Sequence, residues 1–160
     1  MTRLQSEATQ IRPVSVADAD VWLRMRLALW PDATSAEHQH AIERYFAGHR
    51  HEPREVLIAL DAAGSVLGFT ELSIRNVVDS CVTDRVGYLE GWYVEPEARR
   101  RGVGRALVAA AERWAVEQGC SEFGSDALVH NLVSQAAHLA LGFEETGQVR
   151  TFRKDLARQK

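Results

Sequence analysis

Residues 88–108 read YLEGWYVEPEARRRGVGRALV, a strand-like run followed by a glycine- and arginine-rich turn and an apolar helical pattern. The residues from Arg85 to Glu95 predict one long strand, which Pro96 ends. Apolar positions from Val103 to Ala115 recur at helical spacing and predict a helix that Gly119 closes. Strict alternation along the strand predicts two faces, one with Tyr88, Glu90, Trp92 and Val94, the other with Leu89, Gly91 and Tyr93.

The turn between this strand and helix is suited to an anion. A helix start leaves backbone N–H groups without intrahelical partners, and the aligned peptide dipoles add positive charge there. Gly102 and Gly104 would allow a close backbone approach, and Arg99, Arg100, Arg101 and Arg105 would supply charged donors. The spacing matches neither the Walker A pattern nor the three-glycine dinucleotide fingerprint. A solvated helix start therefore stays open as the alternative.

Composition narrows the class of protein. The chain has 160 residues, 19 Lys and Arg against 22 Asp and Glu, and a net charge of −3. We expect one domain, and the acidic balance argues against a nucleic-acid partner. Cys81 and Cys120 stand alone, without a zinc spacing, so we expect reduced thiols, no metal and a cytoplasmic protein. The first 13 residues lack the apolar core of a signal peptide, and no segment is apolar enough to span a membrane.

The remaining pattern predicts a mixed α/β sheet with helices on both faces. Ser15 with Asp18, and Thr34 with Glu37, resemble capping boxes at the starts of two helices. The expected order is an edge strand at 9–15, helices at 15–31 and 34–48, strands at 55–60 and 66–74, a loop at 76–84, the strand and helix already described, a strand at 121–127, a helix at 131–143 and a last strand at 148–156.

The strand, glycine turn and later segment NLVSQAAHLALGF together resemble the GNAT acyltransferase superfamily. The resemblance implies a GNAT fold over residues 1–160, with a mostly antiparallel sheet that splays where acetyl-CoA binds. It implies that the strand backbone bonds the pantetheine arm and that the turn holds the pyrophosphate. The cofactor residues expected on this basis are Trp92, Tyr93, Val94, Arg99, Arg100, Gly102, Val103, Gly104, Arg105 and Asn131.

One position departs from the wider superfamily. Many members carry a tyrosine near the departing thiolate, seven residues after the asparagine, where this chain has His138. Its imidazole could protonate or hydrogen-bond the sulfur, or it could be a packing residue of the helix.

Segments from Leu27 to Thr146 further resemble the chromosomal aminoglycoside 6'-N-acetyltransferases, among them LALWP, GFTELSIRN, YLEGWYV and GCSEFGSD. The resemblance implies transfer of an acetyl group to the 6'-amine of a polycationic aminosugar, and thereby antibiotic resistance. Trp30 would line the antibiotic pocket, and Glu90 and Asp126 would bind amino groups and assist proton removal. Glu90 could instead pair with an arginine, and Asp126 could only cap the following helix.

The chain differs from that branch in two places. Val77 and Val78 stand where relatives tend to carry an aromatic residue, and Gly147 and Gln148 stand where an acid is expected. We expect Val78 to line the pocket, and Glu144 or the adjacent Glu145 to compensate for the missing acid.

The expected mechanism is direct attack of the amine in a ternary complex, with the oxyanion held by a backbone N–H at Trp92 or Val94. No sequence neighbour would activate Cys81 or Cys120, which disfavours a covalent acyl-enzyme. The alternatives are a GNAT enzyme for another small amine or a protein N-terminus, a catalytically silent acyl-CoA-binding module, and a nucleic-acid binder. Relatives often dimerise through their C-terminal segments, so the resemblance also implies a homodimer.

Overall fold

Within the part of the chain that the structure describes, five strands form one mixed sheet in the order β1-β2-β3-β4-β5. The structure is a computed structural model and describes residues 9–157. Residues 1–8 lie outside the described residues. They belong to the N-terminal stretch that the sequence predicts is not a signal peptide. The strands are β1 Gln10–Pro13, β2 Glu55–Leu60, β3 Val66–Arg75, β4 Val86–Val94 and β5 Glu122–Ser125. All neighbouring strands are antiparallel except β4 and β5, which are parallel.

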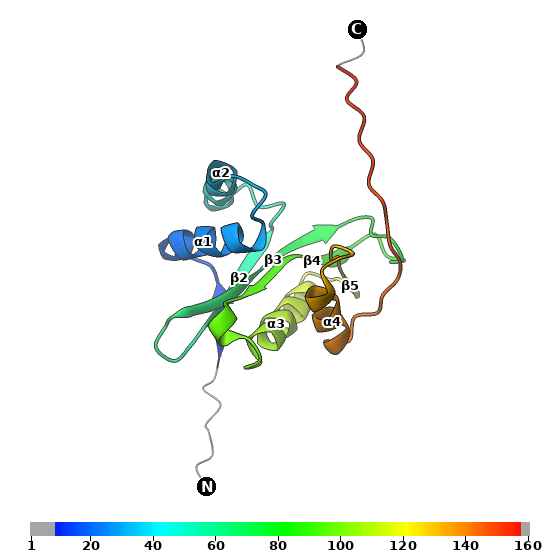
Figure 1. Ribbon diagram of the computed structural model, residues 1–160. Coiled ribbons are helices and arrows are strands. Elements are labelled where there is room, and N and C mark those ends of the chain that lie inside the picture. The colour runs from blue at the N-terminus through cyan, green and yellow to red at the C-terminus, as the bar shows by residue number, and fades with distance from the viewer. Residues whose placement is uncertain (1–8, 158–160) are drawn as a thin grey trace. The chain divides into compact units, whose positions relative to one another are not determined.

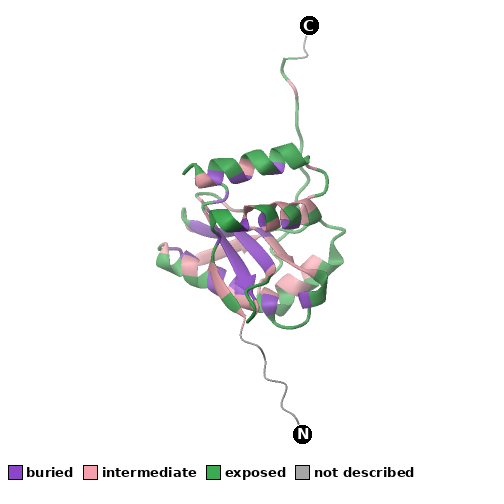
Figure 2. Cartoon of the chain, turned by 90° about the vertical axis from the view of Figure 1, so that its left-hand side faces the viewer, coloured by how far each residue is buried: buried purple, intermediate pink, exposed green. Residues whose placement is uncertain are grey.

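Helices cover both faces of this sheet, as the sequence predicts. The α1 helix spans Ala19–Leu29 and α2 spans Ser35–Phe46, and both lie on one face, while α3 (Val103–Glu117) lies on the other (Figure 1). Two single 3-10 turns, η1 at Val16–Asp18 and η2 at Pro96–Ala98, precede α1 and follow β4. Figure 2 shows that the buried residues concentrate in the strands and on the inner sides of the helices.

The chain divides into two compact units, residues 1–126 and residues 127–160. The first holds the sheet and α1 to α3, and the second holds α4 at Leu132–Ala140. The expectation of one domain over residues 1–160 stays a prediction.

Both predicted capping boxes form. Asp18 accepts from the Ser15 backbone N–H at 2.7 Å, and Thr34 accepts from the Glu37 N–H at 3.2 Å. Each box satisfies donors that a helix start would otherwise leave unpaired, because the first turn has no preceding carbonyls. Local sequence therefore sets where both helices begin.

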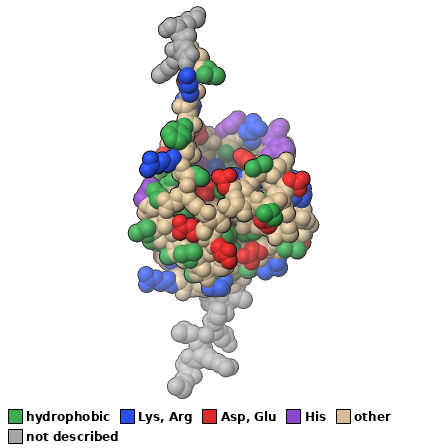
Figure 3. Space-filling view, turned by 90° about the vertical axis from the view of Figure 1, so that its right-hand side faces the viewer, with side chains coloured by type: hydrophobic (Ala, Val, Ile, Leu, Met, Phe, Trp, Pro, Cys, Tyr) green, Lys and Arg blue, Asp and Glu red, His purple; other side chains and the backbone are tan. Residues whose placement is uncertain are grey.

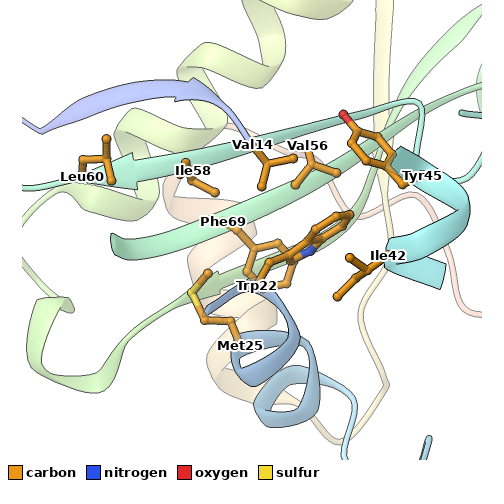
Figure 4. Packing of buried hydrophobic residues seen from close by; sticks show 9 residues of the cluster. All are labelled: Val14, Trp22, Met25, Ile42, Tyr45, Val56, Ile58, Leu60 and Phe69. Atoms are coloured by element: carbon orange, nitrogen blue, oxygen red, sulfur yellow. The ribbon is translucent and has the colours of Figure 1, made fainter. Parts of the chain in front are cut away.

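The larger core lies between α1, α2 and the sheet. Trp22 of α1 and Phe69 of β3 lie at its centre, with Tyr45 packed edge-on against Trp22 at 5.3 Å between ring centroids (Figure 4). On the opposite face, Val103 and Leu107 of α3 pack against Ala59 of β2. These two apolar layers hold the sheet between the helices.

The predicted faces of β4 are correct up to Glu90 and wrong from Gly91 onward. Glu71 of β3 pairs with Gly91 and the next residue, Leu72, pairs with Leu89, so Glu90 is an extra residue in a β-bulge. A bulge restarts the alternation, so Gly91 and Tyr93 share the α1 face with Tyr88 and Glu90. Trp92 and Val94 instead face α3, where they pack against the Val103 and Leu107 layer.

The predicted last strand is also wrong. Residues 143–155 contain neither helix nor strand, and Val149, Phe152 and Leu156 are exposed. An alternating sequence becomes a strand only when a neighbouring strand completes its hydrogen bonds, and this segment has no such pairing in the described chain. Figure 3 shows hydrophobic and basic side chains along this extended segment.

Asp18 makes a pH-dependent contribution to stability. Its two carboxylate oxygens accept from Arg12 of β1 at 2.8 and 3.0 Å, and this pairing lowers the Asp18 pKa from 3.8 to about 2. A depressed carboxyl pKa stabilises the fold above the unfolded value and loses that effect as pH falls through the folded value.

We therefore expect Asp18→Asn to lower the free energy of unfolding at neutral pH by about 1 kcal/mol. The difference from the wild type should shrink between pH 3.8 and about 2. Denaturant unfolding at a series of pH values measures it, with the exposed Glu43→Gln as the control for a lost carboxylate. A difference that is independent of pH would contradict the assignment.

Candidate functional site

Strand β4 continues past the end of its pairing with β5. The parallel ladder covers only Val86–Leu89 against Glu122–Ser125, whereas β4 runs on to Val94. The edge of β4 beyond Leu89 thus has no paired strand in the described chain, at the place where the splay is predicted. Glu95 N–H donates to the Leu67 carbonyl of β3, so by alternation the backbone groups of Trp92 and Val94 point to the other edge, where β5 has ended.

The glycine turn follows directly. Gly102 is the N-cap of α3 with φ +81°, a left-handed conformation that favours glycine, and Arg100 before it has φ +61°. A Cβ on Gly104 would lie 2.8 Å from the Trp92 ring, so this glycine is needed for helix–strand packing as well as for any ligand. Arg100, Arg101 and Arg105 are exposed around the helix start.

Arg99 is already engaged within the chain. Its Nε donates to the Val94 carbonyl at 2.9 Å, and its guanidinium lies 5.8 Å from the centre of the Tyr93 ring. Its predicted pyrophosphate contact would therefore use the terminal nitrogens of the guanidinium. Val103 is buried against Leu107, so only its backbone at the helix start could meet an anion.

Glu90, the bulge residue, points to the α1 face and pairs with an arginine, which was the alternative foreseen for it. Arg75 of β3 donates to it twice, from Nε to Oε1 at 2.9 Å and from Nη2 to Oε2 at 2.6 Å. The Ser73 hydroxyl donates to Oε1 as well. Glu90 thus keeps the face of Tyr88 and is held by two side chains of β3.

Asp126 lies just beyond β5 and accepts a hydrogen bond from the Tyr88 hydroxyl at 2.7 Å. Burial is the main cause that raises the Tyr88 pKa, and the hydrogen bond to Asp126 adds to it, so this phenol stays a donor. Arg75 stacks on the same Tyr88 ring, 3.6 Å from its centre. Tyr88 and Arg75 therefore join the two predicted carboxylates, and Asn131 rather than Asp126 caps the next helix.

Val78 lies against a glycine of β5, and Trp30 lies against a glycine of β4. A Cβ on Gly124 would lie 3.2 Å from Val78 and 3.1 Å from Tyr88, which places Val78 beside the tyrosine that holds Asp126. A Cβ on Gly91 would lie 2.5 Å from the Trp30 ring. Because Gly91 follows Glu90, Trp30 covers the strand next to the bulge.

A buried polar network that sequence reasoning missed supports Trp30. Arg26 and the Trp22 indole both donate to Glu71 of β3, and the Arg26 guanidinium lies 4.9 Å from the centre of the Trp30 ring. Arg26 Nε donates to His38 Nδ1 at 3.2 Å, which leaves His38 Nε2–H to donate to the Trp30 carbonyl at 3.1 Å.

Burial dominates the titration of Glu71 in this network. It raises the Glu71 pKa, while Arg26 opposes the shift by favouring the charged form. The sequence contains one signal of this network. Trp22, Arg26 and Trp30 are spaced four residues apart, so the Arg26 charge lies on the apolar side of α1. Such a charge requires a buried partner.

The second unit carries the other predicted residues. Asn131 Oδ1 accepts from the Ser134 N–H at 3.1 Å and so caps α4. His138 Nδ1 lies 2.7 Å from the Ser134 carbonyl, and its ring meets Phe143 edge-on at 5.1 Å. Because a carbonyl only accepts, Nδ1 carries a hydrogen, and Nε2 can give a proton only from the doubly protonated ring. Glu144 is exposed.

The 76–84 loop is tied to β5. Glu122 accepts from the Val82 and Thr83 N–H groups and from the Thr83 hydroxyl. Burial raises the pKa of the nearby Cys81 thiol, and Glu122 raises it further. A raised thiol pKa disfavours the thiolate, so Cys81 is a poor nucleophile.

Within residues 9–157, no group of three His, Cys, Asp or Glu side chains is arranged to hold a metal ion. No helix of the described chain is long and apolar enough to cross a membrane.

Comparisons with known proteins agree with this geometry. The model of the acetyltransferase (GNAT) family matches residues 22–143. The aminoglycoside N(6')-acetyltransferase type 1 of Klebsiella aerogenes is 53% identical over 91% of this chain and 96% of its own. The protein of the same name from Stenotrophomonas maltophilia is 40% identical over 94% and 96%. The chain belongs to the GNAT acetyltransferase family.

Solved structures agree with this acetyltransferase in fold. AAC(6')-Iy in complex with the bisubstrate analogue CoA-S-monomethyl-acetylneamine has a TM-score of 0.84 and is 37% identical, over 92% of this chain and 99% of that one. The aminoglycoside antibiotic 6'-N-acetyltransferase AAC(6')-IG of Acinetobacter haemolyticus gives the same four values. The predicted GNAT fold is thereby confirmed.

Replacing Gly91 in this acetyltransferase should push Trp30 off the strand. Because the new Cβ would overlap the indole, Gly91→Ala should cost about 1–3 kcal/mol of unfolding free energy. In a Trp30→Ala background the same change should cost little, since the obstruction is gone. Denaturant unfolding of the four proteins measures the coupling. Equal costs in both backgrounds would show that Trp30 does not lie on Gly91.

Proposed function

We propose that the protein transfers the acetyl group of acetyl-CoA to the 6'-amine of aminoglycosides, giving antibiotic resistance. The observation that carries the proposal is the pair of carboxylates, Glu90 and Asp126, joined through Arg75 and Tyr88 beside the end of the β4–β5 ladder. Acidic groups at that point suit a polycationic acceptor, because a cleft of one charge concentrates the opposite charge.

The cofactor residues proposed for acetyl-CoA form a continuous path along the chain. Trp92, Tyr93 and Val94 would meet the pantetheine arm through the strand backbone. Gly102, Val103 and Gly104 would present N–H groups to the pyrophosphate, with Arg99, Arg100 and Arg105 as charged donors. The left-handed Gly102 and the exposed arginines support this fit. In the second unit, Asn131 would add a contact through its side-chain amide nitrogen.

The proposed reaction is one direct displacement in a ternary complex. Acetyl-CoA supplies the thioester carbonyl that the amine nitrogen attacks. The N–H of Trp92 or Val94 would hold the oxyanion, which their orientation toward the splayed edge supports. Asp126 would accept the proton from the amine, directly or through water, and Glu90 would hold an amino group of the acceptor. As the C–S bond breaks, the doubly protonated His138 would give a proton to the sulfur.

Trp30 would form one wall of the acceptor pocket, and Val78 would lie near Asp126. Glu144 would supply a further carboxylate from the second unit. The stacking of Trp30 on Gly91, next to Glu90, supports the first of these roles.

The acceptor is tested by a matched pair of aminoglycosides that differ only in an amine or a hydroxyl at position 6'. Purified protein should release CoA thiol with acetyl-CoA and the 6'-amine compound, such as kanamycin or tobramycin, and not with its 6'-hydroxyl counterpart. The product should carry one acetyl group at position 6'. Equal turnover of both compounds, or release only with other small amines, would contradict the proposal.

Substitutions of the two carboxylates should change different kinetic constants. Asp126→Asn should lower kcat by about 100-fold, because a general base contributes on that scale. Glu90→Gln should instead raise the aminoglycoside KM by about tenfold, the scale of a charged hydrogen bond. Acetyl-CoA affinity should stay unchanged in both, and Glu43→Gln on α2 is the matched control. Unchanged steady-state kinetics in both variants would remove these roles.

We also propose a cytoplasmic homodimer that pairs through the C-terminal segment. The exposed apolar residues Val149, Phe152 and Leu156 and the absence of a strand partner in the described chain support such pairing. The two cysteines, both without a disulfide, support the reducing compartment.

A further inference from the structure

Arg75 occupies the carboxylate that the acceptor would need. Its guanidinium donates to both oxygens of Glu90, at 2.9 and 2.6 Å, and the Ser73 hydroxyl takes a further acceptor site. A carboxylate offers about four lone-pair sites, so little of Glu90 is left for another donor. An incoming ammonium group therefore meets a carboxylate that is already neutralised.

Two arginine–carboxylate pairs have their acid on a strand of the sheet, Glu71 on β3 and Glu90 on β4, and they differ in exposure. In the Arg26–Glu71 pair the side chains are 12% and 4% exposed, whereas in the Arg75–Glu90 pair they are 35% and 19% exposed. A guanidinium that is one-third exposed can return to water at low cost, which a buried one cannot. Of the two pairs, only Arg75–Glu90 is open to exchange with a cation from solution.

Arg75 has other partners that would retain it after release. Its guanidinium lies on the face of Tyr88, and Glu52, just before the cis Glu52–Pro53 bond, also acts on it electrostatically. A small rotation about the Arg75 side chain would therefore keep a favourable contact while freeing the Glu90 oxygens.

We propose that Arg75 is the internal counter-ion of Glu90 and that an ammonium group of the aminoglycoside replaces it during binding. The proposal rests on the function proposed above, because it takes Glu90 as an acceptor-binding group. Arg75 thereby limits acceptor affinity, and it keeps Glu90 paired when no acceptor is bound.

Removal of Arg75 tests the proposal, because a competing cation and a supporting residue predict opposite changes in acceptor affinity. If Arg75 only held Glu90 in place, its removal would weaken acceptor binding. As a competing cation, its removal should strengthen binding: Arg75→Gln should lower the Kd and KM for a 6'-amine aminoglycoside by about five- to tenfold at low salt. The gain should shrink as salt screens the charges.

Calorimetry with tobramycin and the full-length chain saturated with CoA measures the Kd. The double variant Arg75→Gln, Glu90→Gln should bind no more tightly than Glu90→Gln alone, because the gain acts through Glu90. Arg24→Gln, which removes the exposed arginine of the Arg24–Glu95 pair, controls for net charge and should leave the Kd unchanged. Acetyl-CoA affinity should be the same in all variants.

If Arg75→Gln does not fold, Arg75→Lys gives the same test on a smaller scale. A lysine keeps the charge but cannot bond both oxygens as a fork, so it should lower the Kd by about twofold. Unchanged or weaker tobramycin binding by the folded variant would overturn the inference alone, provided that the wild type acetylates the antibiotic. No CoA release by the wild type with any 6'-amine aminoglycoside would overturn the proposed function and this inference together.

Discussion

The extra residue at Glu90 is the constraint on which the site depends. Because it restarts the alternation of β4, it puts Gly91 under Trp30 and Trp92 against Gly104, on opposite faces of the sheet. Without it, Glu90 would take its regular place in the ladder, and Trp92 would point into the α1 core. The bulge also lies immediately after the last residue that β4 pairs with β5. One backbone irregularity thus lies next to the Glu90 carboxylate, the Trp30 ring and the unpaired edge of β4.

Glycines make these close contacts possible. Trp30 lies on Gly91, Val78 and Tyr88 lie on Gly124, and Trp92 lies on Gly104. In each case an aromatic or branched side chain fills the space of a missing Cβ. Gly91, Gly104 and Gly124 therefore serve close packing. Of the two glycines in the helix turn, Gly102 has a positive φ, which adds a conformational reason for glycine at that position.

The Arg26–Glu71 and Arg75–Glu90 pairs differ in how far water can reach them. Arg26 and Glu71 are enclosed by Trp22, Trp30 and His38, so they hold the helix and the indole in position. Arg75 and Glu90 make similar bonds at a more open place, where the solvent can compete. Burial, rather than the chemistry of the groups, distinguishes a structural pair from one that a ligand can enter.

The sequence by itself determined the order of the elements from β1 to α4, both capping boxes, the helix closed by Gly119 and the family, because these depend on local patterns and on spacing along one strand, turn and helix. Only the tertiary structure decided the faces of β4 beyond Glu90, since a bulge is defined by the partner strand. It likewise decided that Glu90 pairs with Arg75 and Asp126 with Tyr88, which lie 15 and 38 positions away. The C-terminal segment 148–156 is the opposite case: its alternation predicted a strand, but hydrogen bonding to a neighbour, which no local pattern contains, decides whether a strand forms.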